Sequence, residues 1–329
     1  MRRLICSAAL CALAWWPAAQ AQTQAQTFPV PGRPISILYG FPAGTPGDVY
    51  LRLSAPRLSA ALGVPVTVES RVGATGNIAA EAVARAPADG HTVLLATTSL
   101  TATNPLLLHM PIDPMRDLLP VMRVFDAPNA FTVSTAARPQ YTDCKAVMSA
   151  LRAAPGRLNY ASSGIGASTH LAAAQFLQAT GLEAQHIPYR GGPAAMVALY
   201  QGDVDFFFYQ SGTVVEDMRA GRVRILGITS AARHPQLPEI PTVAEACDLP
   251  GFVSTTWHGL MVPAGTPGVA VTRLAQEFAK VNAAPEIQAR LVALGLTPLV
   301  SDPAEMQATT ERDIRSWGEV VRRAGLRRE

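Results

Sequence analysis

From residue 35 to residue 48 the chain reads ISILYGFPAGTPGD, an apolar run followed by a segment rich in glycine and proline. The β-branched residues predict a strand over Ile35–Tyr39, and the glycines and prolines predict a loop over residues 40–47. Asp48 then begins a predicted amphipathic helix, whose apolar positions include Val49, Leu51, Leu53, Leu58 and Leu62. The order strand, glycine-rich loop, helix is the pattern that the rest of the chain repeats.

Strands and helices alternate along most of the sequence. Further strands are predicted over residues 64–68, 92–96, 130–134, 158–161, 185–189, 204–209, 223–229 and 256–262. Further helices are predicted over residues 77–85, 143–153, 168–180, 192–201, 214–220, 266–281, 285–294 and 303–323. This alternation implies crossover connections and a largely parallel sheet, so the predicted fold class is α/β. Two such units predict two lobes with a ligand cleft between them.

The composition is that of a globular protein, with 49% hydrophobic and 16% charged residues over 329 positions, enough for about two domains. The net charge is +3, and it falls to +1 if a leader carrying Arg2 and Arg3 is removed. Near neutrality without clustered basic residues excludes a nucleic-acid surface. The sequence shows no heptad pattern and no long apolar surface run, which predicts a monomer.

The first 21 residues have the three parts of a secretory signal peptide. Two arginines precede an apolar run from Leu4 to Trp16, and Ala19-Gln20-Ala21 supplies a cleavage motif. The run is shorter than the ~20 residues that cross a bilayer, which disfavours a membrane anchor. We therefore predict export to the periplasm with cleavage after Ala21.

Cleavage would leave two cysteines, Cys144 and Cys247. An oxidising compartment permits a disulfide between them, but nothing in the local sequence indicates that their Cα atoms meet. Two separate thiols are therefore favoured. The absence of a Cys-x-x-Cys motif argues against a zinc or redox site.

Three loops are candidates for an anion site, at residues 41–48, 162–170 and 190–192. Each follows a predicted strand and precedes a predicted helix, where backbone N–H groups favour negative charge. Glycine lets the backbone approach a ligand closely, and serine and threonine add donors. We expect a pocket that binds an anion mainly through uncharged groups.

Catalytic chemistry has little support in the sequence. Ser168 and His170 suggest a hydrolase, but they share one helix start and lack a Gly-x-Ser-x-Gly motif. Gly164 and Gly166 follow a strand as in a dinucleotide loop, but the third glycine of that motif is absent. The six histidines show no metal-ligand pair at helical spacing. We predict no catalytic residue, no metal and no cofactor.

Two aromatic stretches are predicted to belong to the core. The run Phe206–Tyr209 is typical of a buried parallel strand, and only Tyr209, at its carboxyl end, is a candidate for the site. Trp257 and His258 lie on a predicted strand, where packing is favoured over a ligand contact.

Several short motifs occur in a fixed order along nearly the whole mature chain. They are Phe41–Gly44 with Asp48, Glu69–Ile78, Ala88–Thr92, Asn104-Pro105, Leu158–Ser162, His170–Ala172, His186–Gly192, Gly202–Asp205, Pro241–Ala246, Pro263–Pro267 and Trp317-Gly318. Together they resemble the substrate-binding proteins of tripartite tricarboxylate transporters, the TctC-like or Bug family.

The resemblance implies a two-lobed periplasmic binding protein of type II, with a hinge of two crossover strands. Lobe 1 would comprise residues 28–126 and 231–329 and lobe 2 residues 127–230, with crossings near residues 125–129 and 229–233. A small organic carboxylate would be captured between the lobes, and a two-subunit membrane permease would recognise the closed form. The expected ligand-binding residues are Phe41, Pro42, Ala43, Gly44, Asp48, Thr98, Ser99, Ser162, Ser163, Gly164, Gly166, Ser168, His170, Tyr189, Gly191, Gly192 and Tyr209.

Three positions depart from the family pattern. Thr45 replaces a glycine in the first loop, and a positive φ is costly for threonine. Ala167 replaces a serine, which removes or shifts one donor. Tyr209 replaces an acidic residue that could pair with a ligand ammonium, so a non-amino organic acid is expected rather than an amino acid. A ligand-loaded sensor that acts on a signalling partner and, more remotely, an exported hydrolase are the alternative functions.

Overall fold

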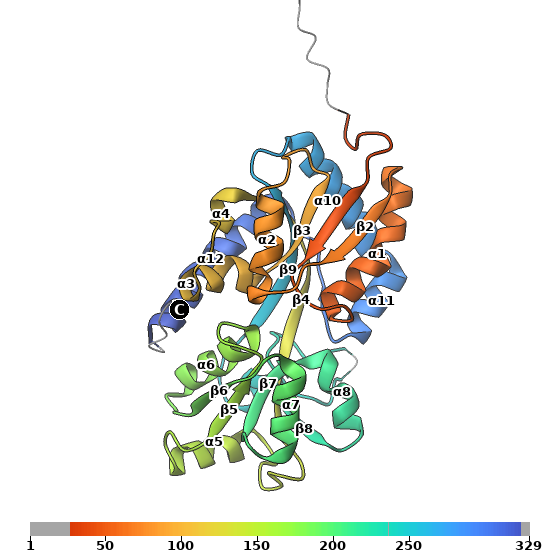
Figure 1. The fold of residues 1–329 in the computed structure, drawn as a ribbon. Helices are drawn as coiled ribbons and strands as arrows, with labels where there is room; N and C mark the ends of the chain where they lie inside the picture. Colours follow the sequence, from red (N-terminus) through yellow and green to blue (C-terminus); the bar gives the residue numbers. More distant parts are fainter. Residues whose placement is uncertain (1–26, 236, 324–329) are drawn as a thin grey trace, which may run out of the picture.

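A computed structural model of the chain describes residues 27–235 and 237–323, so the predicted signal peptide lies outside the described residues. The described chain forms two lobes stacked end to end (Figure 1). Among its helices, none combines the length and the apolar character that crossing a membrane requires. The α/β class and the two lobes predicted from the sequence are confirmed.

Lobe 1 is the upper lobe in Figure 1 and holds both described ends of the chain. Its strands are β1 (Ile35–Tyr39), β2 (Val66–Ser70), β3 (Thr92–Thr97), β9 (Thr255–Pro263) and β10 (Thr297–Pro298). Its helices are α1 (Pro46–Leu62), α2 (Asn77–Ala84), α3 (Asn104–Leu107), α4 (Pro114–Asp117), α10 (Gly268–Asn282), α11 (Pro285–Ala293) and α12 (Pro303–Arg323). A short 3-10 helix, η1 (Ala74–Gly76), and a π-helix, η2 (Ser99–Thr103), complete it.

Lobe 2 is the lower lobe in Figure 1. Its strands are β5 (Asn159–Ser162), β6 (Gln185–Pro188), β7 (Phe206–Gln210) and β8 (Val223–Ile228). Its helices are α5 (Cys144–Ala153), α6 (Ser168–Thr180), α7 (Gly192–Gln201), α8 (Ser211–Arg219) and α9 (Val243–Ala246).

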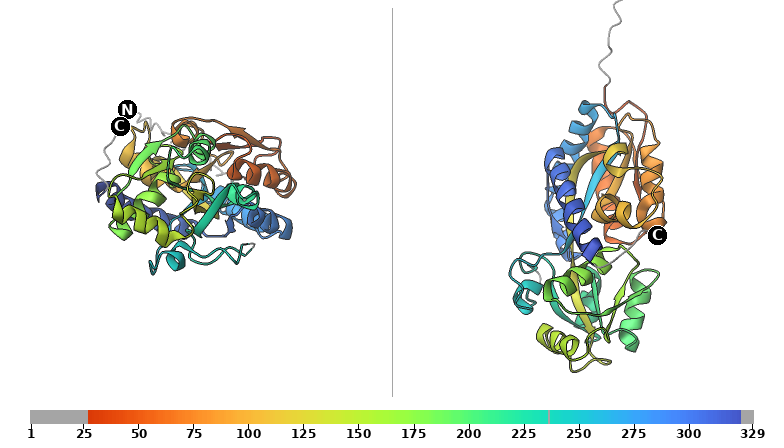
Figure 2. Two further views of the ribbon diagram at one scale, coloured as in Figure 1. Left: turned by 90° about the horizontal axis from the view of Figure 1, so that it is seen from below. Right: turned by 90° about the vertical axis from the view of Figure 1, so that its left-hand side faces the viewer.

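One strand, β4 (Leu118–Ser134), belongs to both lobes. The strands form a ten-stranded sheet in the order β2-β1-β3-β9-β4-β7-β5-β6, with β8 and β10 also paired to β4. Residues 118–128 of β4 pair with β9, and residues 129–134 pair with β7 and β8. Figure 2 shows the same strand joining the lobes from the side. The predicted crossing near residues 125–129 therefore lies inside a continuous strand.

The first part of β4 was not predicted, because its residues are typical of a loop. Pro120 and Pro128 lack an N–H group for the ladder, and Arg123 and Asp126 are charged. In the structure the strand pairing shifts register after Pro120 and again after Arg123. Arg123 Nη2 lies 2.6 Å from Asp126 Oδ1, so the two charges of this strand neutralise each other in an ion pair.

The hinge joins three segments of the chain through Thr229, which follows β8. The Thr229 N–H donates to the Asn129 carbonyl at 2.8 Å, and its hydroxyl accepts from the Asn129 N–H at 2.8 Å. The same hydroxyl donates to the Ser254 carbonyl at 2.6 Å. All three residues are buried, so the hinge excludes water from these bonds.

The return crossing differs from the prediction near residues 229–233. After Thr229 the chain goes back into lobe 2, where α9 packs on β8 and Val243, Cys247 and Phe252 join the core around Phe131. The chain crosses only at the start of β9. Residues 237–252 thus pack in lobe 2, whereas the prediction assigned them to lobe 1. The prediction was wrong because a short capped helix between two proline-rich stretches resembles a linker.

Lobe 2 has an aromatic core. The Phe131 ring stacks on Phe208 with ring centroids 4.5 Å apart and lies 5.0 Å from Phe176. The predicted buried strand is confirmed, since Phe206, Phe207 and Phe208 have no exposed surface. Trp257 and His258 are also buried, as predicted.

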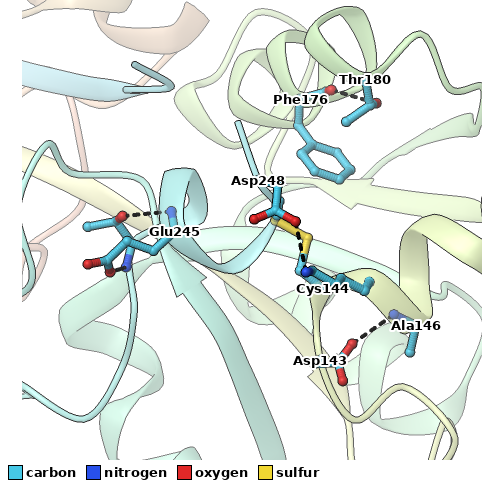
Figure 3. Close-up of a disulfide and its surroundings, with 10 residues drawn as sticks. Asp143, Cys144, Ala146, Phe176, Thr180, Glu245 and Asp248 are labelled. Carbon is cyan, nitrogen blue, oxygen red and sulfur yellow. Dashed lines mark hydrogen bonds and ion pairs between the residues drawn. A yellow bond between two sulfur atoms is a disulfide. The ribbon is translucent and has the colours of Figure 1, made fainter. Parts of the chain in front are cut away.

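Cys144 and Cys247 form a disulfide, which corrects the expectation of two separate thiols (Figure 3). Their Cα atoms lie 5.4 Å apart although 103 positions separate them in sequence. The bond links the first residue of α5 to the residue after α9, and Lys145 and Asp248 form an ion pair beside it. Only the packing of α9 into lobe 2 brings the two sulfurs together, which is why the local sequence gave no signal.

Replacing both cysteines with serine should lower the free energy of unfolding by about 2–5 kcal/mol, because the bond restricts the unfolded chain over a long loop. Denaturant unfolding under non-reducing conditions measures this loss. Wild-type protein with a reductant is the control and should match the double variant. An unchanged transition midpoint in the variant would show that the disulfide does not form in the folded protein.

Candidate functional site

The parallel strands of the two lobes point their carboxyl ends at each other. β4 runs from lobe 1 into lobe 2 and β9 is antiparallel to both β4 and β3, so β3, β1 and β2 all run toward lobe 2. β7 is antiparallel to β4, so β7, β5 and β6 run toward lobe 1. Ligands of α/β sheets bind beyond such strand ends. The loops that follow β1, β3, β5 and β6 therefore meet at the boundary between the lobes (Figure 1).

The helices that begin at this boundary lack side-chain N-caps. The N-cap residues of α1, α6 and α7, which are Thr45, Ala167 and Gly191, make no side-chain cap hydrogen bond. Asp143 caps α5 and Thr242 caps α9, whereas α10, which begins at the far end of lobe 1, also lacks a side-chain cap. Uncapped N–H groups and the helix dipole favour an anion. The boundary therefore offers neutral donors to a negatively charged group.

Tyrosine rings lie over two of these helix starts. A Cβ on Gly47 would fall 2.4 Å from the Tyr39 ring at the start of α1. A Cβ on Gly192 would fall 2.1 Å from the Tyr209 hydroxyl at the start of α7, and burial raises the pKa of that phenol. The start of α6 is different, because Ser168 is half-buried and its hydroxyl makes no hydrogen bond within the described residues.

The first loop has an unstrained path. Thr45 has φ −69°, and the left-handed residue is Gly44 with φ 83°, so threonine at position 45 costs no positive φ. The Asp48 carboxylate is buried and accepts from the Gly44 N–H at 2.9 Å and from Arg52 Nε at 2.9 Å. Burial alone would raise the pKa of Asp48, but these hydrogen bonds hold it below its usual range. Asp48, predicted to face the ligand, is turned inward and holds the loop.

Polar side chains within the second loop hold its backbone. The Ser162 hydroxyl lies 2.6 Å from His186 Nε2 and accepts from the Gly164 N–H at 3.2 Å. The Ser163 N–H donates to the Thr169 hydroxyl at 2.9 Å. Ser162 has no exposed surface, so its hydroxyl supports the loop from inside. The sequence had predicted instead that this hydroxyl would face a ligand.

His170 is likewise turned into the loop. Its Nδ1 accepts from the Gly166 N–H at 3.1 Å, and its ring stacks on His186 with centroids 3.8 Å apart. Burial, with the nearby His186, lowers the pKa of His170 to about 3, and burial lowers the pKa of His186 to about 4. Both rings are therefore neutral at neutral pH, and the predicted ligand contact of His170 is replaced by an internal one.

The third loop lies against the second. The Tyr189 N–H donates to the Ser162 carbonyl at 2.9 Å, and Gly191 precedes α7 with φ 100°. Tyr189 is half-buried. The structure thus brings together the predicted residues of the second and third loops on one face of lobe 2.

In lobe 1, Thr98 and Ser99 follow β3 as expected, but their hydroxyl groups differ in the hydrogen bonds that they already make. The Thr98 hydroxyl oxygen accepts from the Trp257 N–H at 2.9 Å. The Ser99 hydroxyl makes no hydrogen bond within the described residues. Phe41 lies close to Gly76, in van der Waals range of a Cβ placed there.

Two hydrogen bonds between the lobes were not foreseen. The Thr103 hydroxyl donates to the Gly166 carbonyl at 3.2 Å, and a Cβ on Gly166 would come within 3.1 Å of Leu107. At the opposite edge the Ser211 hydroxyl donates to the Gly295 carbonyl at 3.0 Å. Thr103 lies in the π-helix after β3, and the only sequence signal was a run of serine and threonine directly after a strand.

The arrangement does not resemble a hydrolytic site. His170 bonds to Gly166 and not to Ser168. The serine that does contact a histidine, Ser162, has no exposed surface, so it offers no accessible nucleophile. Within residues 27–235 and 237–323, no group of three His, Cys, Asp or Glu side chains is placed to hold a metal ion.

Residues 50–326 match the family model described as the tripartite tricarboxylate transporter family receptor. A protein in the tcbD-tcbE intergenic region of Pseudomonas sp. is 36% identical over 88% of this chain and 86% of its own length. BugT of Bordetella pertussis is 32% identical, with 93% of each chain covered.

Solved structures agree with these sequence relatives. R. palustris Rpa4515 with adipate is 32% identical, covers 92% of this chain and all of its own, and superimposes with a TM-score of 0.82. The periplasmic binding protein BugD is 31% identical over 91% of this chain and all of its own, with a TM-score of 0.78. MatC from Rhodopseudomonas palustris with bound malate is 28% identical over 89% of this chain and all of its own, with a TM-score of 0.76. With the two-lobed type II fold and the loops described above, these likenesses show that the chain belongs to the TctC-like Bug family of periplasmic solute-binding proteins.

Proposed function

We propose that this protein captures a small organic carboxylate between its two lobes and delivers it to a tripartite tricarboxylate-type permease. The observation that carries the proposal is the set of helix N-termini at α1, α6 and α7, which have no cap from the N-cap side chain and follow strands that run toward the lobe boundary. Such N–H groups bind a carboxylate without a paired cation. The ligands of two related structures, adipate and malate, belong to this chemical class.

The ligand would sit against backbone and hydroxyl groups of both lobes. In lobe 1 these are the backbone of Phe41–Gly44 and the hydroxyl of Ser99; in lobe 2 they are the start of α6 with Ser168 and the loop at Tyr189–Gly192. Asp48, Ser162 and His170 would act indirectly, by holding the loops. Because the anion would touch both lobes, it would favour the closed arrangement by its differential contacts.

Tyr209 supports a ligand without an amino group. Its ring stacks on Phe207 with centroids 4.8 Å apart and covers Gly192, so an uncharged phenol lines this part of lobe 2. An ammonium placed beside it would lack a carboxylate partner and would lose hydration without compensation. Asp205 does not supply that partner, because it is already bonded to Arg138 at 2.6 Å.

We further propose that the protein acts as a monomer in the periplasm, after cleavage near Ala21. Delivery to a permease and action on a signalling partner both require ligand capture. If the protein serves transport, deletion of the permease genes should stop uptake of the ligand. If it serves sensing, deletion of its own gene should leave uptake unchanged and abolish a transcriptional response to the ligand.

Adipate and malate should raise the melting temperature of the protein more than aspartate or glutamate do. A ligand at 100 times its Kd stabilises the folded state by about 2.7 kcal/mol, which for a chain of this size is roughly 5 °C. A thermal-shift panel of dicarboxylates, aromatic acids and amino acids measures the order. Larger shifts with both amino acids than with every deaminated analogue would contradict the role given to Tyr209.

Gly192→Val should abolish the ligand-induced shift and destabilise the apo protein by about 1–3 kcal/mol, because the added side chain displaces the Tyr209 ring from the start of α7. Ala194→Val, on the exposed part of the same helix, is the matched control and should retain the shift. A Gly192→Val protein that keeps the full shift would remove this loop from the site.

A further inference from the structure

The Gly166 peptide group is where the second loop is fastened on both sides. Its N–H donates to His170 Nδ1 at 3.1 Å inside lobe 2. The Gly166 carbonyl accepts from the Thr103 hydroxyl of lobe 1 at 3.2 Å. The position of Gly166 therefore depends on the His170 imidazole, and it determines whether the Thr103 hydroxyl of lobe 1 can bond to lobe 2.

The imidazole that holds Gly166 is part of a stacked histidine pair. The rings of His170 and His186 are parallel within 6° and 3.8 Å apart, and Tyr160 flanks both. His186 in turn contacts Ser162 at the other end of the same loop. The pair thus supports the loop at its first residue and just before α6.

We propose that His170 is a positioning residue, which holds the loop against lobe 1 only while its imidazole is neutral. The inference rests on the proposed function for the claim that this loop contacts the ligand, but the hydrogen bond itself is independent of any ligand. Protonation would add an N–H at Nδ1, facing the N–H of Gly166, and would remove the acceptor. Gly166 would then leave its place, and the contact with Thr103 would be lost.

The sign of the pH response follows from burial. The titratable groups that face the pair are Tyr160 from β5 and the two rings themselves, from α6 and β6. No acidic side chain contributes to the lowered pKa of either ring, about 3 for His170 and about 4 for His186. An imidazole in the released loop would regain a pKa of about 6.5. The free energy needed to release the loop is therefore highest above pH 6.5, and it decreases progressively as the pH falls below that value.

Hydrogen exchange of the Gly166 amide in the ligand-free protein, followed by NMR, tests the proposal. Between pH 7 and pH 5 its protection factor, corrected for intrinsic exchange, should fall roughly 25-fold for each imidazole released. His170→Asn supplies an oxygen acceptor that does not titrate and should lose about 25-fold less protection over the same range. His170→Phe keeps a stacked ring without an acceptor, so Gly166 should exchange rapidly at both pH values.

His109→Asn is the matched control, because His109 is exposed and its loss should leave the wild-type profile unchanged. Amides of β4 report global unfolding, which also releases the other buried imidazoles, so at both pH values they should stay more protected than Gly166. Equal protection factors at Gly166 and in β4, or the same profile in the wild type and in His170→Asn, would overturn the proposal. If His170→Phe does not fold, the comparison with His170→Asn still decides. Since no ligand is added, a failed ligand panel leaves this result unaffected.

Discussion

The hydrogen bonds of Thr229, which follows β8, tie together the two chain segments that cross between the lobes, β4 at Asn129 and the residue before β9 at Ser254. All are buried, so a lost bond there would leave a polar group without water. β4 and β9 enter lobe 1 side by side from this point, and the rest of the sheet takes its direction from them. Movement between the lobes must therefore bend the strands near residues 128–129 and 254–255, while each lobe keeps its own core.

The same strand directions explain why the boundary between the lobes suits an anion. Seven strands end there, and the N-cap residues of the helices after β1, β5 and β6 make no side-chain cap hydrogen bond. Asp48 is paired with Arg52 and Arg71 with Glu69, whereas Arg190 in the third loop is exposed and makes no ion pair within the described residues. Backbone dipoles, which carry no net charge, favour a carboxylate beside these helix starts.

A cost of binding through backbone groups is that the loops need internal support. Asp48 holds the first loop through the Gly44 N–H, and Ser162, Thr169 and His170 hold the second. These polar residues looked like ligand contacts in the sequence because they are small or titratable and stand in glycine-rich loops. In the structure their hydrogen-bonding atoms are directed at the loop backbone. Shape at the site is therefore set by buried side chains that a ligand need not touch.

Much of this protein could be predicted from sequence alone because it depends on local pattern. The strand at Ile35–Tyr39 and the helices at Ser168–Thr180 and Gly192–Gln201 have the predicted bounds, and glycine-rich loops mark the boundary where strands end. The ordered motifs indicated the family. Tertiary structure alone decided the long course of β4 through two prolines, the return of residues 237–252 to lobe 2, the Cys144–Cys247 bond and the inward turn of His170. Each of these depends on partners far away in the sequence or on which face a side chain takes in the packed lobe, and neither is encoded in the residues on either side.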